Sequence, residues 1–128
     1  MNILDYKLNT ITKIPNYLDG KFDLFEIKQY EKGKFPVEYL KDSKKSMFFQ
    51  ELSITDKLQF EAEQRDRKLT MKIRIPQTKE ITALNVLKIG DKYHKVYNAY
   101  HFTNKEGFKE TDLTLEIYPN VILEDKIC

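Results

Sequence analysis

The chain is poor in the residues that hold small secreted proteins together. Among its 128 residues there is a single cysteine, Cys128, and no tryptophan. One thiol cannot form a disulfide within a molecule, so the fold needs no oxidising compartment. A cysteine at the end of a chain usually lacks the electropositive surroundings that activate a thiol, so we expect Cys128 to be inert.

Long apolar runs are also missing. The first twelve residues contain Asp5 and Lys7 and no apolar run of signal-peptide length. No segment approaches the roughly 20 apolar residues of a membrane-spanning helix. We therefore expect a protein without a membrane partner, made and kept in a cytoplasm or assembled there into something larger.

Charge of one sign is not in excess. The chain has 22 Lys and Arg against 20 Asp and Glu, a net charge of +2. A dedicated nucleic-acid binder would be expected to carry a larger one-sided field. With 41% apolar and 33% charged residues, the composition is typical of one folded and very soluble domain.

Glycine and proline are scarce, and most of them separate segments in which apolar and polar residues alternate. Such alternation predicts half-buried strands. The predicted strands are residues 22–30, 46–54, 68–75, 84–89, 92–102 and 112–118, with a tight turn at Gly90-Asp91 between the fourth and the fifth. In the first strand the alternation slips between Leu24 and Phe25, which indicates a bulge or burial of both faces.

In three of these strands the alternation places a set of residues on one shared face, and in the third and the last strand we expect this face to point inward. The residues that share it are Phe48, Gln50, Leu52 and Ile54 in the second strand, Leu69, Met71, Ile73 and Ile75 in the third, and Leu113, Leu115 and Ile117 in the last. In the last strand the intervening Asp112, Thr114 and Glu116 are expected to face outward.

One helix of about three turns is predicted over residues 55–66. Ile54, Leu58 and Ala62 follow one another at helical spacing, and Ser53 with Asp56 suits a helix start. A single helix cannot supply the crossovers of a parallel sheet. The predicted fold class is therefore mainly β: a small antiparallel β-barrel or sandwich with one short α-helix between the second and third strands.

The predicted organisation is an N-terminal arm over residues 1–20 and one barrel-like domain over residues 21–128. Residues 31–45 contain five lysines and three acidic residues with Gly33 and Pro36. They predict a long polar loop between the first two strands, which is functional or disordered in most compact domains.

No catalytic residue, metal site or cofactor is predicted. His94 and His101 are seven residues apart on one strand, so they should face opposite sides and cannot share a metal unless a bulge intervenes. The acidic residues Glu61, Glu63 and Asp66 alternate with basic residues and are typical of a solvated helix face. No nucleophile-elbow, Walker or dinucleotide motif is present.

Two interpretations remain open for the basic and aromatic fifth strand. Aromatic and basic side chains that alternate on a strand can stack on and neutralise single-stranded nucleic acid. The other interpretation is an amphipathic strand whose aromatic residues enter the core. The candidate nucleic-acid surface consists of Lys92, Tyr93, Lys95, Tyr97 and Tyr100.

Four segments in this order resemble a known family. They are a strand running into a helix start, ELSITDKLQFE (51–61), an amphipathic strand, KLTMKIRI (68–75), a glycine-turn hairpin, LKIGDKYHKVY (87–97), and a closing strand, TDLTLEI (111–117). The pattern resembles the head-closure proteins of long-tailed bacteriophages and prophages, also called stoppers or head–tail connectors. Tail-terminator proteins of the same phage neck are the nearest alternative.

The resemblance implies a non-enzymatic virion component of the phage neck, assembled in the bacterial cytoplasm. Such proteins are small barrels that form a ring on the portal and adaptor after packaging, retain the double-stranded DNA and dock tail proteins. The free protein would then be a monomer or a weak oligomer.

By the same resemblance, residues 31–45 correspond to a segment that projects into the central channel as a plug. We expect that shortening this segment leaves the melting temperature nearly unchanged. The candidate plug residues are Lys32, Lys34, Phe35, Pro36, Val37, Tyr39, Leu40, Lys41, Lys44 and Lys45.

Overall fold

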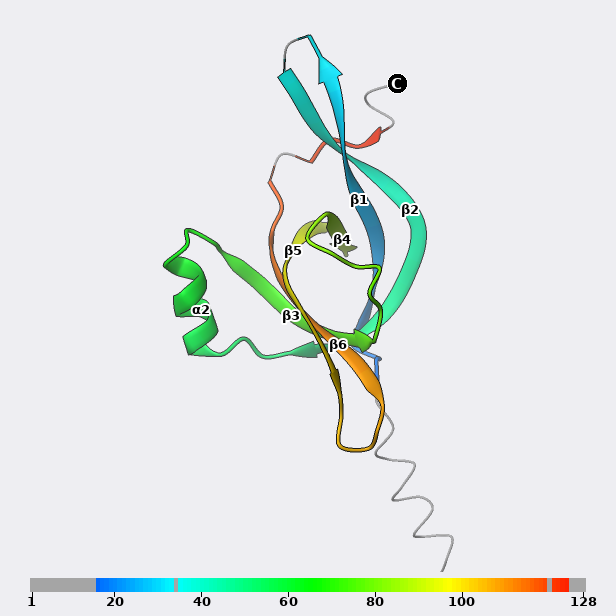
Figure 1. Cartoon of the computed structure of the whole chain (residues 1–128), viewed down its shortest axis with the longest axis vertical. Helices are drawn as coiled ribbons and strands as arrows, with labels where there is room; N and C mark the ends of the chain where they lie inside the picture. The colour runs from blue at the N-terminus through cyan, green and yellow to red at the C-terminus, as the bar shows by residue number, and fades with distance from the viewer. Residues whose placement is uncertain (1–15, 34, 120, 125–128) are drawn as a thin grey trace, which may run out of the picture.

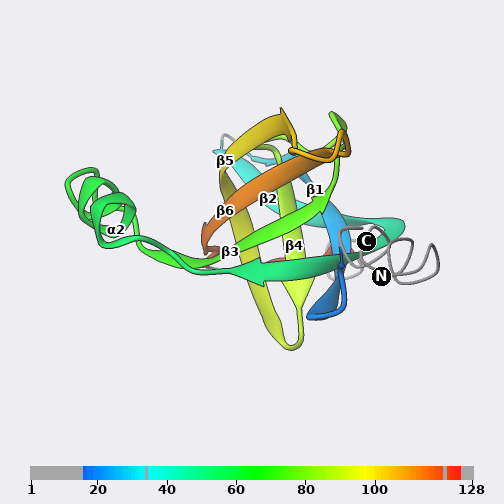
Figure 2. The same ribbon diagram turned by 90° about the horizontal axis from the view of Figure 1, so that it is seen from below.

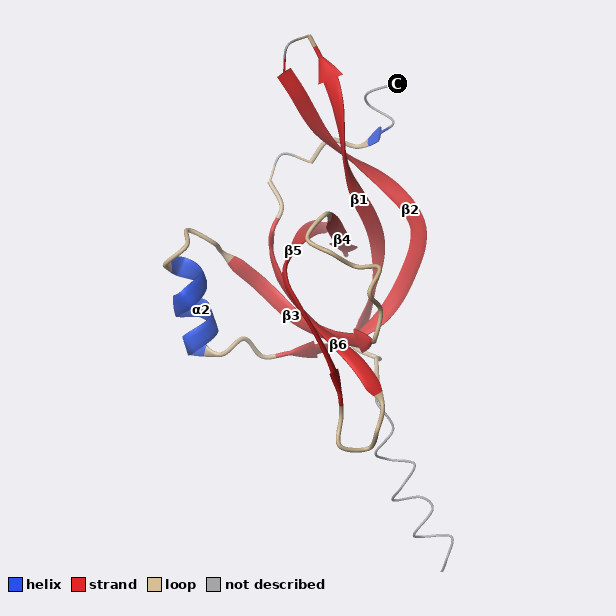
Figure 3. Ribbon diagram, in the orientation of Figure 1, coloured by secondary structure: helices blue, strands red, loops and turns tan. Residues whose placement is uncertain are grey.

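The computed structural model describes residues 16–33, 35–119 and 121–124 and contains a closed antiparallel barrel (Figure 1). The strands are β1 (Gly20–Lys32), β2 (Phe35–Leu52), β3 (Leu69–Pro76), β4 (Asn85–Ile89), β5 (Lys92–Thr103) and β6 (Lys109–Ile117). Their order around the barrel is β1-β2-β3-β6-β5-β4, and β4 pairs back with β1. Helix α2 (Asp56–Glu63) lies between β2 and β3 (Figure 3). The predicted fold class is confirmed, and the architecture is the barrel.

The main core fills the inside of the barrel. Its buried residues come from all six strands and from Ile81: Phe22, Leu24, Phe49, Ile73, Ile75, Ile81, Leu87, Val96, Leu113 and Leu115. The predicted inward face of β3 is confirmed, because Leu69, Ile73 and Ile75 are buried and Met71 packs partly buried against the core. Burying each such side chain contributes about 1.5–3 kcal/mol.

A second, smaller apolar cluster lies outside the main core. It contains Phe25, Leu40 and Val86, with Tyr93 and the C-terminal segment packed against them. The predicted bulge is confirmed, because the β1–β2 register shifts between Leu24 and Phe25. The shift lets Leu24 enter the main core and Phe25 enter the second cluster.

The face of β2 that carries Phe48 is its outer face. Phe49 enters the core with 2% of its surface exposed, whereas Phe48 is 60% exposed on the outer face. Because Phe48 and Phe49 are adjacent, the alternating pattern fits equally well with either one facing the core. The sequence therefore does not show which phenylalanine is buried. The neighbouring Met47 packs partly buried against the core, in phase with Phe49.

The prediction for β6 is wrong in part. Leu113 and Leu115 are fully buried as expected, but Ile117 is 54% exposed at the end of the strand. Asp112, Thr114 and Glu116 lie on the outer face and are nevertheless buried. Side chains from β3, β5 and the turn after α2 cover them. The alternation of residues within β6 cannot predict that side chains from other elements will bury its outer face.

The predicted loop over residues 31–45 is wrong. β1 and β2 pair through this region from Lys32↔Phe35 at the turn to Phe25↔Asp42, and the pairing resumes at Leu24↔Lys45 after a bulge at Ser43 and Lys44. Gly33 supplies the turn with a φ of +69°, which a glycine adopts without strain. The distal part of this hairpin projects beyond the barrel (Figure 1), and even its apolar positions Val37 and Tyr39 are only half-buried, so burial imposes a weak alternation there.

Helix α2 is shorter than predicted and has a different cap. Thr55, not Ser53, is the N-cap, and its side chain accepts a hydrogen bond from the Leu58 amide at 3.2 Å. At the other end Asp66 has a φ of +56°, and the Arg67 amide donates to the Ala62 carbonyl at 2.9 Å. This left-handed turn ends the helix and directs the chain back to the barrel.

Helix α2 stands clear of the barrel rather than on it (Figure 2). A cleft of about 610 Å³ separates it from β5, with Leu58 and Glu61 on the helix side and Lys95 and Tyr97 on the strand side. No helix in the described part of the chain is long and apolar enough to cross a membrane.

Candidate functional site

The distal part of the β1–β2 hairpin projects beyond the barrel (Figure 1). Near its turn, Phe35 is 76% exposed and Tyr30 is also exposed, while Val37 and Tyr39 are half-buried. Pro36 is exposed beside Phe35. Lys32 ends β1, and Lys34 lies outside the described residues. The tip therefore presents aromatic side chains that contribute nothing to either core.

The base of the hairpin is fixed to the barrel by Leu40. This residue is fully buried in the second cluster, and its amide donates to the Ile122 carbonyl at 2.7 Å. It also forms a parallel bridge with Leu123, and Tyr118 donates to Glu38 at 3.3 Å. The C-terminal segment thus packs along the hairpin base. Leu40 is a core residue rather than part of a plug, so only the hairpin beyond it can be removed without opening the cluster.

The remaining candidate lysines lie along β2 below the tip. Lys41, Lys44 and Lys45 are exposed, and Lys45 forms a surface ion pair with Glu80 at 3.0 Å. Lys44 has a φ of +62°, and its amide donates to the Asp42 side chain at 2.8 Å. The structure therefore does not gather the described candidate plug residues at one point: the exposed aromatic ones lie near the hairpin turn, and Lys41, Lys44 and Lys45 lie near its base.

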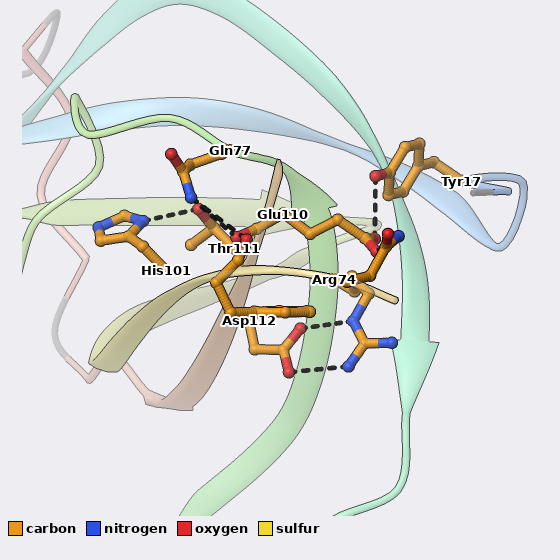
Figure 4. Close-up of polar contacts among 9 residues, drawn as sticks. Tyr17, Arg74, Gln77, His101, Glu110, Thr111 and Asp112 are labelled. Carbon is orange, nitrogen blue, oxygen red and sulfur yellow. Dashed lines mark hydrogen bonds and ion pairs between the residues drawn. The ribbon is translucent and has the colours of Figure 1, made fainter. Parts of the chain in front are cut away.

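The outer face of β6 carries a row of buried polar side chains with partners on neighbouring elements. Arg74 Nε and NH2 donate to the two carboxylate oxygens of Asp112 at 2.7 and 3.0 Å (Figure 4). The hydrogen bond to Asp112 raises the pKa of Arg74 above its ordinary value. Farther along β6, the Arg67 NH1 group donates to Glu116 Oε1 at 2.7 Å, while Glu116 Oε2 is buried without a hydrogen-bond partner among the described residues.

The chain just before β1 is attached at the same face. The hydroxyl of Tyr17 donates to Glu110 Oε2 at 3.0 Å (Figure 4), and Asn104 donates to Glu110 Oε1 at 2.7 Å. Burial, followed by this hydrogen bond, raises the pKa of Tyr17 to about 12. The predicted N-terminal arm lies outside the described residues as far as residue 15, and Tyr17 is where its continuation meets the barrel.

Aromatic side chains cover this ionic row. Tyr100 stacks on Phe102 with ring centroids 5.5 Å apart, and the Arg74 guanidinium lies 4.9 Å from the Phe102 centroid. Strand register places Gln50, Arg74, Asp112 and Tyr100 in one row and Pro76, Glu110 and Phe102 in the next, and Phe48 lies two residues before Gln50 on β2. We call this surface the outer-face platform; it consists of Phe48 and Gln50 (β2), Arg74 and Pro76 (β3), Glu110 and Asp112 (β6), and Tyr100 and Phe102 (β5).

The candidate nucleic-acid residues do not form one continuous exposed stripe. Tyr93 is half-buried and packs edge-on against Phe25, with ring centroids 5.6 Å apart. Lys95 lies opposite Glu116 in the β5–β6 pairing, and the register shifts between Val96 and Asn98. The two members that are exposed lie at opposite ends of the strand: Lys92 at its start and Tyr100 on the platform.

The expectation that the two histidines face opposite sides is wrong. The bulge between Val96 and Asn98 returns His94 and His101 to the same side of β5. They remain six register positions apart, roughly 20 Å at about 3.3 Å per residue. Each bonds a threonine instead: His94 with Thr70 and His101 with Thr111, both at 2.7 Å. Among the described residues no group of three metal-ligating side chains comes together.

Sequence reasoning missed the outer-face platform. The signal was available in part, because Arg74 and Asp112 stand in adjacent antiparallel strands at polar positions, where a cross-strand ion pair is favourable. No model of a known protein family matches the chain, and no curated protein sequence is significantly similar to it.

Proposed function

We propose that the chain is a structural component of a phage neck: a head-closure protein that forms a ring on the portal and adaptor, retains packaged DNA and docks the tail. The observation that carries the proposal is the β1–β2 hairpin. It projects from a closed barrel and exposes Tyr30 and Phe35 at its end, where neither side chain packs against the chain's own core. Such a projection suits an element that contacts neighbouring subunits.

The closed barrel itself supports a role in assembly. Within the barrel every strand has a partner on both sides, so free strand edges are confined to the projecting part of the β1–β2 hairpin. Association must then use side chains and projections, which permits a chain that stays dispersed until it meets its ring.

The distribution of lysines on the hairpin supports proximity to DNA. Lys41 and Lys44 are exposed on β2, and neither has an ion-pair partner among the described residues. Phosphate groups are neutralised by such side chains without sequence preference. In a ring these lysines would be present in every subunit. The total positive charge near the DNA would then be several times that of one copy.

The experiment that tests this function shortens the hairpin in a phage or prophage that encodes the chain. Residues 30–37 are replaced by Asn-Gly, a two-residue turn that joins the register partners Gln29 and Glu38. Leu40 and its cluster are untouched, so the melting temperature should change by only about a few degrees. Heads should package DNA and then lose it. Normal DNA retention and normal infectivity would remove the plug role.

Binding of single-stranded nucleic acid is the weaker candidate. Tyr100 is exposed and stacked, as a base-stacking residue would be, but the carboxylates of Glu110 and Asp112 lie beneath it. Titration with fluorescent oligonucleotides at low and moderate salt separates the two functions. The neck function predicts no salt-sensitive micromolar binding, whereas such binding would favour the alternative.

A further inference from the structure

One buried carboxylate oxygen of the barrel has an unused capacity to accept a hydrogen bond. Glu116 on β6 is 5% exposed, and the Arg67 NH1 group donates to its Oε1 at 2.7 Å. Within the described ranges, Glu116 Oε2 is the one buried side-chain polar atom that accepts no hydrogen bond. Folded proteins pair nearly all such atoms, because a buried oxygen without a donor has lost its hydration and gained nothing in return. Glu116 can therefore accept one further donor if its surroundings rearrange.

The surroundings of Glu116 include the cleft between helix α2 and β5. This cleft has a volume of about 610 Å³ and two walls. The wall on the helix side consists of Leu58, Glu61 and Arg65, and the wall on the barrel side includes Arg67, Lys95, Val96, Tyr97 and Glu116. Figure 2 shows α2 clear of the barrel, with a connecting segment at each of its ends.

The two walls carry net charges of opposite sign. Helix α2 contains one lysine and three acidic residues, a net charge of −2, and with Arg65 included the helix side still has a net charge of −1. The barrel wall carries Arg67 and Lys95 against Glu116, a net charge of +1. The net charges of the two sides therefore favour their approach.

The charged groups of the two walls can also be matched one to one. In the part of the chain that the structure describes, Glu61, Arg65 and Lys95 form no ion pair. Glu61 on the helix has the opposite charge to Lys95 on β5. Arg65 can supply the donor that Glu116 Oε2 does not have in the open cleft.

The apolar parts of the walls favour closure as well. Leu58 on the helix side and Tyr97 on the strand side are both half-buried. Helix α2 has only eight residues, and tertiary contact supplies most of the stability of protein helices. Contact between Leu58 and Tyr97 would bury apolar surface that faces the open cleft, and this burial would stabilise the helix.

The attachment of α2 defines how it can move. Its C-terminal end is fixed, because Ala62 is fully buried and its carbonyl accepts from the Arg67 amide at 2.9 Å. Its N-terminal end is joined to β2 by residues 53–55, which belong to neither a strand nor a helix. A hinge at the turn around Asp66 therefore lets the end of α2 near Asp56 swing over the cleft.

We propose that α2 is a strap that closes onto β5 by this hinge motion. Closure joins Arg65 to Glu116 Oε2 and Glu61 to Lys95, and it brings the apolar parts of the walls together. The described structure is the open form. A partner side chain that enters the cleft must displace these two ion pairs, so occupation of the cleft and opening of the strap are one coupled equilibrium. The inference is independent of the proposed neck function.

Distances between two spin labels, measured by double electron–electron resonance, test the motion. The labels are placed on Lys57→Cys, near the moving end of α2, and on Lys92→Cys, at the start of β5, in a chain that also carries Cys128→Ser. Lys57 and Lys92 are both exposed, so neither label disturbs the core. Two distance populations are expected, and the shorter one belongs to the closed strap.

A double-mutant cycle in the labelled chain tests the contacts. Glu61→Gln and Lys95→Gln should each lower the ratio of closed to open molecules roughly two- to fivefold, and the double variant should lower it no further. Arg65→Gln should also lower the ratio, because it removes the donor to Glu116. The matched control is Glu63→Gln, which removes the same charge from α2 at a residue that does not line the cleft. This control should leave the ratio unchanged.

The outcomes that overturn the strap are specific. They are a single distance population in the labelled parent chain, a ratio that neither Glu61→Gln nor Arg65→Gln changes, and an equal effect of Glu63→Gln. Strictly additive effects of Glu61→Gln and Lys95→Gln would show that these two residues do not contact. Glu61 and Arg65 are exposed, so their variants remain informative even if Lys95→Gln lowers the melting temperature. None of these outcomes bears on DNA retention, which the hairpin experiment tests separately.

Discussion

Arg74 on β3 and Asp112 on β6 form a two-point ion pair on the outer face of the barrel, with donor–acceptor distances of 2.7 and 3.0 Å. The Asp112 side chain is almost fully buried, whereas that of Arg74 is partly exposed. The pair fixes the register between the two strands and places the guanidinium against Phe102. It therefore connects the stability of the barrel to the shape of the outer-face platform.

Removal of this arginine should destabilise the barrel. In Arg74→Ala, Asp112 is left buried without its partner, and we expect a loss of about 2–4 kcal/mol in the free energy of unfolding. Urea denaturation measures it. The matched control is Lys45→Ala, which breaks the exposed Lys45–Glu80 pair and should cost no more than about 1 kcal/mol. Equal losses in the two variants would show that the buried pair is not a structural contact.

The adjacent phenylalanines of β2 give a test of the strand phase. Phe49→Ala opens a cavity in the main core and should cost about 3–5 kcal/mol. Phe48→Ala removes an exposed ring and should change the free energy of unfolding by only about 0.5 kcal/mol. Thermal or urea melting of the two variants compares them directly. The reverse order of stabilities would mean that β2 enters the barrel in the other phase.

Acid should weaken the fold through His94. Burial and the neighbouring Lys92 charge lower its pKa below 6.5, so in acid the unfolded chain takes up a proton that the folded protein resists. The stabilisation is complete above pH 6.5 and is lost as the pH falls below that value. His94→Gln should therefore flatten the decline in melting temperature between about pH 7 and pH 5. His101→Gln is the control, and an unchanged slope in His94→Gln would contradict the assignment.

The helix cap can be tested without affecting the barrel. Thr55→Ala removes the acceptor of the Leu58 amide and should cost α2 about 0.5–2 kcal/mol of local stability. Amide hydrogen exchange should then be faster in residues 56–63 and unchanged in the strands. Ser53→Ala, at the cap position expected from the sequence, should leave the exchange of α2 as in the wild type. Faster exchange in Ser53→Ala, with unchanged exchange in Thr55→Ala, would show that Ser53 is the N-cap.

The sequence predicts those parts of the fold that depend on local pattern. The alternation of β3, the turn at Gly90 and the slip between Leu24 and Phe25 each reflect a preference of a few adjacent residues, and all three are present. The hairpin beyond Leu40 does not follow from the sequence, because its apolar positions Val37 and Tyr39 are only half-buried and neither face strongly selects apolar residues. In the sequence, the only local sign of this hairpin is Gly33 at its turn.

The candidate site was harder to predict because it depends on contacts across strands. Asp112 and Glu116 look like solvent-facing residues when β6 is considered alone. Their burial follows from Arg74 and Arg67, which are distant in the sequence and reach them only after the barrel has closed. The bulge beside Val96 likewise reverses the expected facing of His101, since one inserted residue changes the side of every residue that follows.

We propose that this chain closes a filled phage head. Its most direct test adds purified chain to tail-less, DNA-filled heads from a phage that lacks the gene, and measures the fraction of DNA digested by added nuclease. The account predicts that wild-type chain protects the DNA and that the shortened hairpin variant binds the heads without protecting it. Heads that remain equally sensitive to nuclease with and without wild-type chain would contradict the claim.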